Sequence, residues 1–203
     1  MVWVKKRATE RRKQILKATF QAVVDKGYEG VTLQDIADYA GVSKGVTNYY
    51  FENKEDIFAH LLEWLTSKIY EREMRSIEKE EKALAKLQTY LDNVFASPTE
   101  NRQFYRVYLD FLSQVKGNVR YQQVNQQFYQ NCWGIGQLIA ELGTKEGVFI
   151  VKDTEMTAKL MRGVIDGMLI QWLMQDEDDL HKIYKKMCLE GILTLLHYQR
   201  EES

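Results

Sequence analysis

The chain has 203 residues, a formal net charge of −1, 45% hydrophobic and 28% charged residues, and a single proline. This length suffices for one domain or two small ones with a sizeable core, and so few helix breakers favour long helices over a many-stranded sheet. The nearly balanced charge excludes a uniformly basic protein that coats nucleic acid.

The charge is nevertheless uneven along the chain. Residues 1–54 hold ten Lys and Arg against six Asp and Glu, whereas residues 55–203 hold 18 against 23. Phosphate binding needs only a local positive field, so the N-terminal quarter is the candidate region for nucleic-acid binding. An ordinary solvated surface is the alternative explanation of this charge.

Signals for export, membranes and metals are not found. The stretch MVWVKKRATERRKQ is charged without a following apolar segment, and no later stretch approaches the roughly 20 apolar residues that span a bilayer. Cys132 and Cys188 lie far apart, without the paired spacing of a zinc or redox motif. We therefore expect a cytoplasmic protein with buried thiols, no cofactor, no metal and no membrane partner.

The first predicted helix spans residues 9–26, with Thr9 as its N-cap and Gly27 at its end. Its apolar face consists of Ile15, Ala18, Thr19, Ala22 and Val23. Its start carries Arg11, Arg12, Lys13 and Lys17, preceded by Lys5, Lys6 and Arg7. Cations at a helix N-terminus oppose the helix dipole, so these residues either contact phosphates or belong to a solvated tail.

Two short helical patterns then meet at a glycine turn. Thr32 and Asp35 form the pattern of a capping box before a helix over residues 33–40, and Gly41 follows where a left-handed conformation is required. Ser43 caps a second helix over residues 44–50. Helix, glycine turn and helix make a helix-turn-helix unit, whose second helix enters the DNA major groove.

The rest of the chain is also helical in pattern. Asn53 caps a long helix that begins at Lys54 with Asp56 in its first turn. Further helices are predicted over residues 81–95, 99–116, 119–142, 154–174 and 180–198, with no convincing strand. The sequence thus predicts an all-α fold, with a three-helix helix-turn-helix head over residues 1–54 and a larger helical domain over residues 55–203.

Residues 9–58 closely resemble the DNA-binding domain of TetR-family transcriptional regulators. The shared features are Gly27-Tyr28, Thr32, Ile36-Ala37, Gly41-Val42-Ser43-Lys44-Gly45, Tyr49-Tyr50-Phe51 and Lys54-Glu55. The remainder resembles the family's helical ligand-binding and dimerisation domain more loosely, at Gly147-Val148-Phe149 and Ile165-Asp166-Gly167-Met168. The resemblance implies a homodimeric repressor that leaves a double-stranded DNA operator when a small-molecule inducer binds the body.

Other classes of function are possible for such a chain. An enzyme is disfavoured, and no catalytic residue is predicted, because His60, His181 and His197 lie on separate helices without a metal spacing and no nucleophile motif is present. A DNA-binding architectural or partner-regulated protein, with the same head but no small-molecule pocket, stays open as an alternative.

The resemblance also implies which residues contact DNA. Lys44 and Asn48 share a helix face and suit guanine and adenine edges, and Gly45 lets the backbone approach closely. The complete set is Thr32, Gln34, Ser43, Lys44, Gly45, Val46, Asn48, Tyr49, Tyr50 and Lys54. The sequence departs from the family pattern at two positions. Thr47 stands where the family usually has an aliphatic residue, which weakens the packing of this helix on the core of the head. Asn48 stands where the family usually has an aromatic residue, a likely phosphate-binding tyrosine, which implies an altered operator preference.

Aromatic residues and methionines recur on several helices of the body. Core packing explains such stripes, and so does an apolar cavity for a drug-sized ligand. The cavity hypothesis assigns Phe104, Tyr108, Phe111, Tyr129, Trp133, Met161, Ile165, Met168 and Trp172. Asp110 and Asp166 beside them either recognise a cationic ligand or are paired within the structure.

The last two predicted helices carry a further apolar face. Gly163 and Gly167, four residues apart, permit close approach of another helix. The predicted dimer interface consists of Leu160, Gly163, Gly167, Met174, Ile183, Met187, Ile192 and Leu195. Two such helices from each protomer would form a four-helix interface, as in the family.

Overall fold

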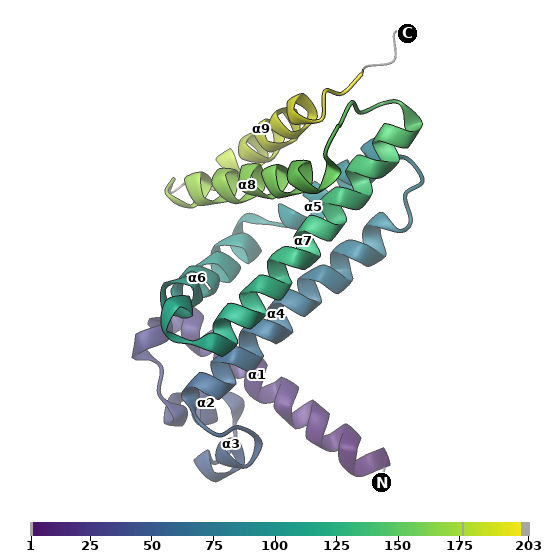
Figure 1. Cartoon of the computed structure of the whole chain (residues 1–203). Coiled ribbons are helices and arrows are strands. Elements are labelled where there is room, and N and C mark those ends of the chain that lie inside the picture. Colours follow the sequence, from purple (N-terminus) through teal and green to yellow (C-terminus); the bar gives the residue numbers. More distant parts are fainter. Residues whose placement is uncertain (1, 176, 200–203) are drawn as a thin grey trace. The chain divides into compact units, whose positions relative to one another are not determined.

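A computed structural model describes residues 2–175 and 177–199, with side chains described from Arg7 onward. The described residues form helices and no strand (Figure 1), which confirms the predicted all-α fold. The helices are α1 (Val2–Gly30), α2 (Leu33–Ala40), α3 (Lys44–Tyr50), α4 (Lys54–Ile77), α5 (Ala83–Val94), α6 (Pro98–Gln114), a 3-10 turn (Val115–Gly117), α7 (Val119–Glu146), α8 (Thr154–Leu173) and α9 (Leu180–Leu195).

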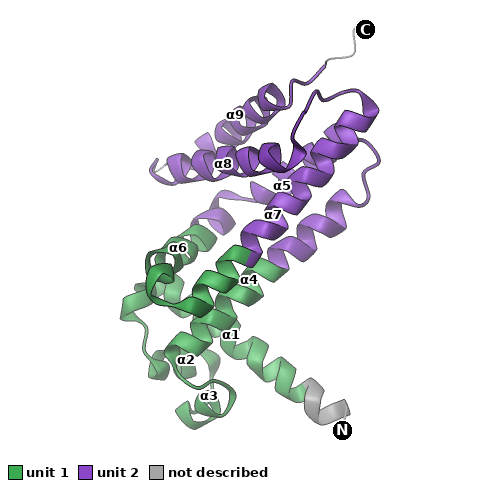
Figure 2. Cartoon of the chain, viewed as in Figure 1, with its two compact units in different colours: residues 1–67, 103–126 green, residues 68–102, 127–203 purple. Residues whose placement is uncertain are grey.

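The chain forms two compact units (Figure 2). The N-terminal unit comprises residues 1–67 and 103–126, and the C-terminal unit comprises residues 68–102 and 127–203. The N-terminal unit is larger than a three-helix head because the start of α4, most of α6 and the start of α7 pack with the helix-turn-helix.

The apolar face of α1 forms part of the core of the N-terminal unit. Ile15 is fully buried, and the hydroxyl of buried Thr19 donates to the Ile15 carbonyl oxygen over 2.8 Å. Gly27 interrupts the helix with a positive φ of 75°, at the position of the predicted stop. One more helical turn follows, in which the Tyr28 amide donates to Asp110 Oδ2 over 3.0 Å. Asp110 is therefore paired within the protein.

In the C-terminal unit, α8 and α9 pack against each other. Their buried residues include Leu169 and Trp172 of α8 and Cys188 of α9. Asp153 caps α8 by accepting the Met156 amide over 2.9 Å. None of the helices in the described ranges is both long and apolar enough to cross a membrane.

Candidate nucleic-acid interface

A capping box fixes the start of α2. The Asp35 amide donates to Thr32 Oγ1 over 3.1 Å, and the Thr32 amide donates to Asp35 Oδ2 over 2.8 Å. Hydrogen bonds from Lys26 and Thr32 hold the pKa of the Asp35 carboxyl well below its ordinary value. The Thr32 hydroxyl also donates to Asp35, over 2.6 Å, so the donors left for a phosphate are the first amides of α2.

A left-handed glycine sets the turn between α2 and α3. Gly41 has a φ of 62° and a ψ of 37°, and its amide donates to the Asp38 carbonyl oxygen. The Val42 amide donates to the Ala37 carbonyl oxygen over 3.0 Å. Ser43 then caps α3 by accepting the Val46 amide over 3.3 Å. The direction of α3 relative to α2 thus follows from backbone geometry and one side-chain cap.

One face of α3 is open to solvent. Its exposed residues are Lys44, Gly45, Asn48 and Tyr49, and Val46 and Tyr50 are half-buried. A β-carbon on Gly45 would meet only Ser43 Oγ, at 3.8 Å, so packing within the chain does not require glycine there. Lys44 and Asn48, the two residues predicted to read bases, are therefore accessible to solvent, as is Gly45 between them.

Thr47 lies on the opposite, buried face of α3. This residue is fully buried, and its Oγ1 has no hydrogen-bond partner among the described residues. An unpartnered buried hydroxyl costs about 1–3 kcal/mol. The structure thus gives a physical reason why Thr47 would weaken the packing of this helix.

Lys54, the first residue of α4, lies over two aromatic rings. Its Nζ is 5.4 Å from the ring centroids of both Tyr28 and Phe58. A cation placed in this way is held by the ring faces. The two rings therefore hold the Lys54 side chain in place before any phosphate contact forms.

A cluster of charged residues joins α1, α4 and α7 within the N-terminal unit. Arg120 forms an ion pair with Asp56, and the Nη2 atoms of Arg12 and Arg120 both lie 2.9 Å from His60 Nε2. The Arg12 guanidinium lies 4.9 Å from the ring centroid of Phe51, which ends α3. Because guanidinium groups have only donors, the imidazole accepts in this cluster, and burial and the nearby Arg120 charge lower the pKa of His60.

The residues assigned to a ligand cavity are divided between the two units. In the N-terminal unit, Phe111 is fully buried and lies edge-on to Tyr121 and Phe58, with ring centroids 5.3 and 5.8 Å away. Phe104 stacks on Tyr108 at 5.4 Å. Phe111 is therefore part of the aromatic core of this unit.

The C-terminal unit holds the other assigned residues, which are Tyr129, Trp133, Met161, Ile165, Met168 and Trp172. Met161, Ile165 and Trp172 are buried, and the Trp172 ring lies 4.6 Å from that of His181. Tyr129 and Trp133 are half-buried and 5.8 Å apart. These contacts agree with the core-packing alternative, and the cavity stays a prediction.

A buried polar cluster accompanies these residues. Arg162 Nη2 lies 2.6 Å from Asp166 Oδ1, so Asp166 has a partner on its own helix. The Arg162 guanidinium also lies 5.2 Å from the ring centroid of Phe128. Burial raises the pKa of the Glu73 carboxyl to about 7, against the opposing effect of the Arg162 and Arg72 charges.

An exposed apolar stripe runs along α8. Its members recur every three or four residues, and they are Met156, Leu160, Gly163, Gly167, Ile170 and Met174. Gly163 is exposed and Gly167 is half-buried, and a β-carbon on either would meet no atom within 4 Å. Ile183 and Met187 of α9 are also exposed, at 52% and 48%. Met156 and Ile170 join the stripe although the predicted interface omits them.

One predicted interface residue lies elsewhere. Ile192 is fully buried, and it points to the interior of the C-terminal unit, as does Cys188 one turn earlier. Its helix phase places Ile192 in the core, so the structure gives no support to its place in the predicted dimer interface, which stays a prediction. Leu195 is half-buried.

Two protein-family models match most of the chain. Residues 15–61 match the model described as bacterial regulatory proteins of the tetR family, and residues 83–197 match that described as the C-terminal region of BetI-type transcriptional repressors. Among curated relatives, the HTH-type transcriptional regulator YhgD of Bacillus subtilis is 25% identical over 188 residues, which are 92% of this chain and 94% of the relative.

Solved structures show the same fold. A transcriptional regulator from Saccharomonospora viridis in complex with choline matches with a TM-score of 0.83 and 22% identity, over 92% of this chain and 96% of that one. FadR from Bacillus subtilis in complex with stearoyl-CoA matches with a TM-score of 0.69 and 23% identity, over 88% and 98%. With both its helix-turn-helix and its helical body matched, the chain belongs to the TetR family of DNA-binding transcriptional regulators.

Proposed function

We propose that this regulator is a homodimeric repressor that binds a palindromic operator with α3 and leaves it when a small apolar or amphipathic molecule binds the body. The observation that carries the DNA part is the exposed face of α3, where Lys44 and Asn48 lie about one turn apart. Lysine suits the guanine O6 and N7 acceptors, and asparagine pairs bidentately with adenine. Gly45 lets the helix approach the bases closely.

Contacts to the sugar-phosphate backbone are proposed for the residues around this face. Tyr49 is 81% exposed, and its ring meets that of Tyr50 edge-on at 5.0 Å. Lys54, Ser43 and the start of α2 at Thr32 and Gln34 would supply the remaining phosphate contacts. Such contacts position the protein on the duplex, while base contacts determine the sequence that it prefers.

The exposed stripe of α8, with Ile183 and Met187 of α9, supports a homodimer. Exposed apolar side chains in such number mark an interaction surface, and a twofold contact buries the same surface on both protomers. A single seven-residue helix reads few base pairs. Two copies about 34–36 Å apart would read both halves of a palindrome.

Control by a small molecule is supported by the similar proteins whose structures hold choline and stearoyl-CoA. Release needs only a ligand that binds more tightly to a dimer whose DNA-binding units misfit the operator. A DNA-binding architectural or partner-regulated protein without a pocket is the alternative. It predicts that no small molecule both raises the Tm of the purified protein and weakens its DNA binding.

The test is selection of bound sequences from random duplex DNA at a fixed salt concentration. A palindrome should be enriched, and Lys44→Ala or Asn48→Ala should relax the preference at particular positions of each half-site, by about 1–3 kcal/mol per contact. Arg106→Ala, at an exposed arginine of α6, is the control and should leave the preferred sequence unchanged. Enrichment of no sequence by the folded protein would contradict the proposal.

A further inference from the structure

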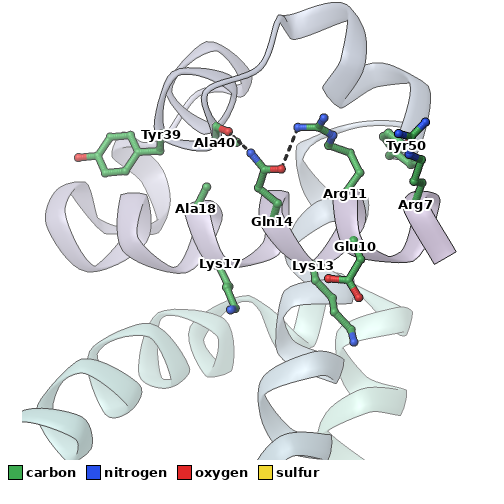
Figure 3. Close-up of a pocket in the computed structure, with 10 residues that line it drawn as sticks. All are labelled: Arg7, Glu10, Arg11, Lys13, Gln14, Lys17, Ala18, Tyr39, Ala40 and Tyr50. Carbon is green, nitrogen blue, oxygen red and sulfur yellow. Dashed lines mark hydrogen bonds between the residues drawn. The ribbon is translucent and has the colours of Figure 1, made fainter.

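A groove of about 1040 Å³ opens on the N-terminal unit between α1 and the helix-turn-helix (Figure 3). It is lined by residues of α1 from Arg7 to Ala18, by Tyr39 and Ala40 at the end of α2, and by Tyr50 at the end of α3. The groove therefore lies directly beside the helix that we propose to read the bases.

The groove is strongly basic. Arg7, Arg11, Lys13 and Lys17 line it, against the single carboxylate of Glu10. None of these four cations forms an ion pair with another side chain in the part of the chain that the structure describes. Arg7 and Arg11 lie on the side of α1 that faces the helix-turn-helix (Figure 3), and uncompensated positive charge in a concave surface creates a local field that attracts an anionic partner.

One of these cations is held in position by the helix-turn-helix itself. Arg11 Nη1 donates to Gln14 Oε1 over 2.8 Å, and Gln14 Nε2 donates to the Ala40 carbonyl oxygen over 2.6 Å. Figure 3 shows both side chains rising from α1 towards the end of α2, while Lys13 and Lys17 project to the other side. Ala40 immediately precedes the Gly41 turn, so the Arg11 guanidinium is tied to the geometry that directs α3.

We propose that this groove binds the sugar-phosphate backbone of the operator beside α3, with Arg11 contacting a phosphate and Gln14 as its positioning residue. The proposal rests on the operator binding proposed above. When a helix enters a major groove about 12 Å wide, the strand that borders the groove must pass along the neighbouring surface. Here that surface is the basic one, because the groove adjoins the ends of both α2 and α3.

Arg7 contacts a second phosphate of the same DNA strand in this proposal. It precedes Arg11 by four residues, which corresponds to about 6 Å along a helix axis. The two guanidinium groups can therefore meet different phosphates. An arginine is suited to this role because its planar donors match phosphate oxygens bidentately.

The salt dependence of DNA binding tests Arg11 directly. Each phosphate contact contributes about 0.9 to the slope of log K against log salt, so Arg11→Ala should reduce that slope by about 0.9 for each bound protomer. Arg106→Ala removes the same charge from another helix of the same unit and should change the slope much less. Ethylation interference should map the lost contact to one phosphate at the border of each half-site.

A substitution of Gln14 distinguishes the positioning of Arg11 from a general effect of positive charge. Gln14→Ala removes no charge but should weaken binding, because Arg11 then loses the acceptor that orients it. In the Arg11→Ala background, Gln14→Ala should have no further effect on DNA affinity. Additive losses in this double-mutant cycle would overturn the positioning role.

A substitution of Glu10 should change the DNA affinity in the opposite direction. Figure 3 shows the Glu10 carboxylate beside Lys13, on the side of α1 away from the helix-turn-helix. Glu10→Gln removes a negative charge near the groove, so it should tighten binding to operator and to random duplex by the same factor. A tightening confined to the operator would overturn a backbone contact, since phosphates carry no sequence information.

The failure of this proposal is distinguishable from failure of operator binding. Equal salt slopes for the wild-type, Arg11→Ala and Arg106→Ala proteins, with operator binding retained, would overturn the groove proposal alone. A wild-type protein that binds no duplex would overturn both proposals. Arg11→Gln serves as a second variant, and thermal unfolding of each variant at matched salt separates a folding defect from a lost contact.

Discussion

Two buried threonines of the N-terminal unit differ in how their hydroxyl groups are satisfied. Thr19 donates to the Ile15 carbonyl oxygen, whereas Thr47 Oγ1 has no partner among the described residues. Thr47→Val keeps the shape of the side chain and removes the unsatisfied group, so it should raise the free energy of unfolding by about 1–2 kcal/mol. Urea denaturation monitored by circular dichroism measures this difference.

Thr19→Val is the matched control for this change. It makes the same substitution in the same unit but removes a hydrogen bond that is formed, so it should leave the free energy of unfolding unchanged or lower it. If both variants are destabilised alike, the Thr47 hydroxyl has a partner in solution and the proposed cost of its burial is wrong.

Single residues also show which contacts can be predicted from the sequence. The caps at Thr32, Ser43 and Asn53 are predicted correctly, because each cap and its amide are only three residues apart. The charged cluster around His60 could not be found in this way. Arg120 and Asp56 are 64 residues apart, and only the tertiary fold brings them together.

At the scale of helices, local signals predict most of the boundaries. The bounds of α2 and α3 agree with the prediction, because a cap and a left-handed glycine act within one turn. The predicted start of the first helix is wrong, because α1 begins at Val2 and Thr9 lies within it. The end of α7 does not agree either. This helix continues past Leu142 to Glu146, with its final turn closed by bonds from the Val148 and Phe149 amides to the Gly143 carbonyl oxygen.

The faces of the long helices are harder to predict than their bounds. Ile192 and Met187 are both apolar residues of α9, yet Ile192 is buried and Met187 is 48% exposed. Periodicity shows that a helix has apolar faces but not which one the same chain covers. The nine residues assigned to a cavity illustrate the same limit, because core packing and a ligand site demand the same residue types.

The exposed stripe of α8 leads to a prediction about the dimer. Gly167→Glu introduces a charge where a β-carbon meets no atom within 4 Å, so the protomer should fold normally. The same charge at a twofold interface would be desolvated and would face its own copy, so the variant should be monomeric. Sedimentation velocity distinguishes monomer from dimer.

The control for this experiment is a charge change off the stripe. Lys182→Glu alters an exposed position of α9, about 100° around the helix from Ile183, and should leave the dimer intact. A dimeric Gly167→Glu protein would show that the protomers associate through another surface.

At the scale of the whole molecule, the buried carboxyl of Glu73 links stability to pH. Its pKa is raised to about 7 in the folded protein by burial, from an ordinary value of 4.5. The folded state then binds the proton more tightly than the unfolded state. The contribution of Glu73 to the free energy of unfolding should therefore be greatest below about pH 4.5. It should decline as the pH rises from 4.5 to 7.

Glu73→Gln should remove this contribution. The variant should resemble the wild-type protein at pH 5 and exceed its free energy of unfolding at pH 8, by on the order of 3 kcal/mol. Denaturant unfolding of both proteins across this range measures the difference. Glu78→Gln, at an exposed position of the same unit, should show no such pH-dependent gain, and an equal gain in both variants would contradict the assignment to Glu73.

The turn between α2 and α3 also bears on how such a protein diversifies. Its geometry depends on Gly41 and backbone hydrogen bonds, and the exposed side chains at positions 44 and 48 take no part in it. If Lys44 and Asn48 read the bases as proposed, replacements there would change the DNA that is recognised at little cost to folding. After a gene duplication, one copy could acquire a new set of target promoters through a few mutations at these exposed positions. The residues that form the turn would stay unchanged.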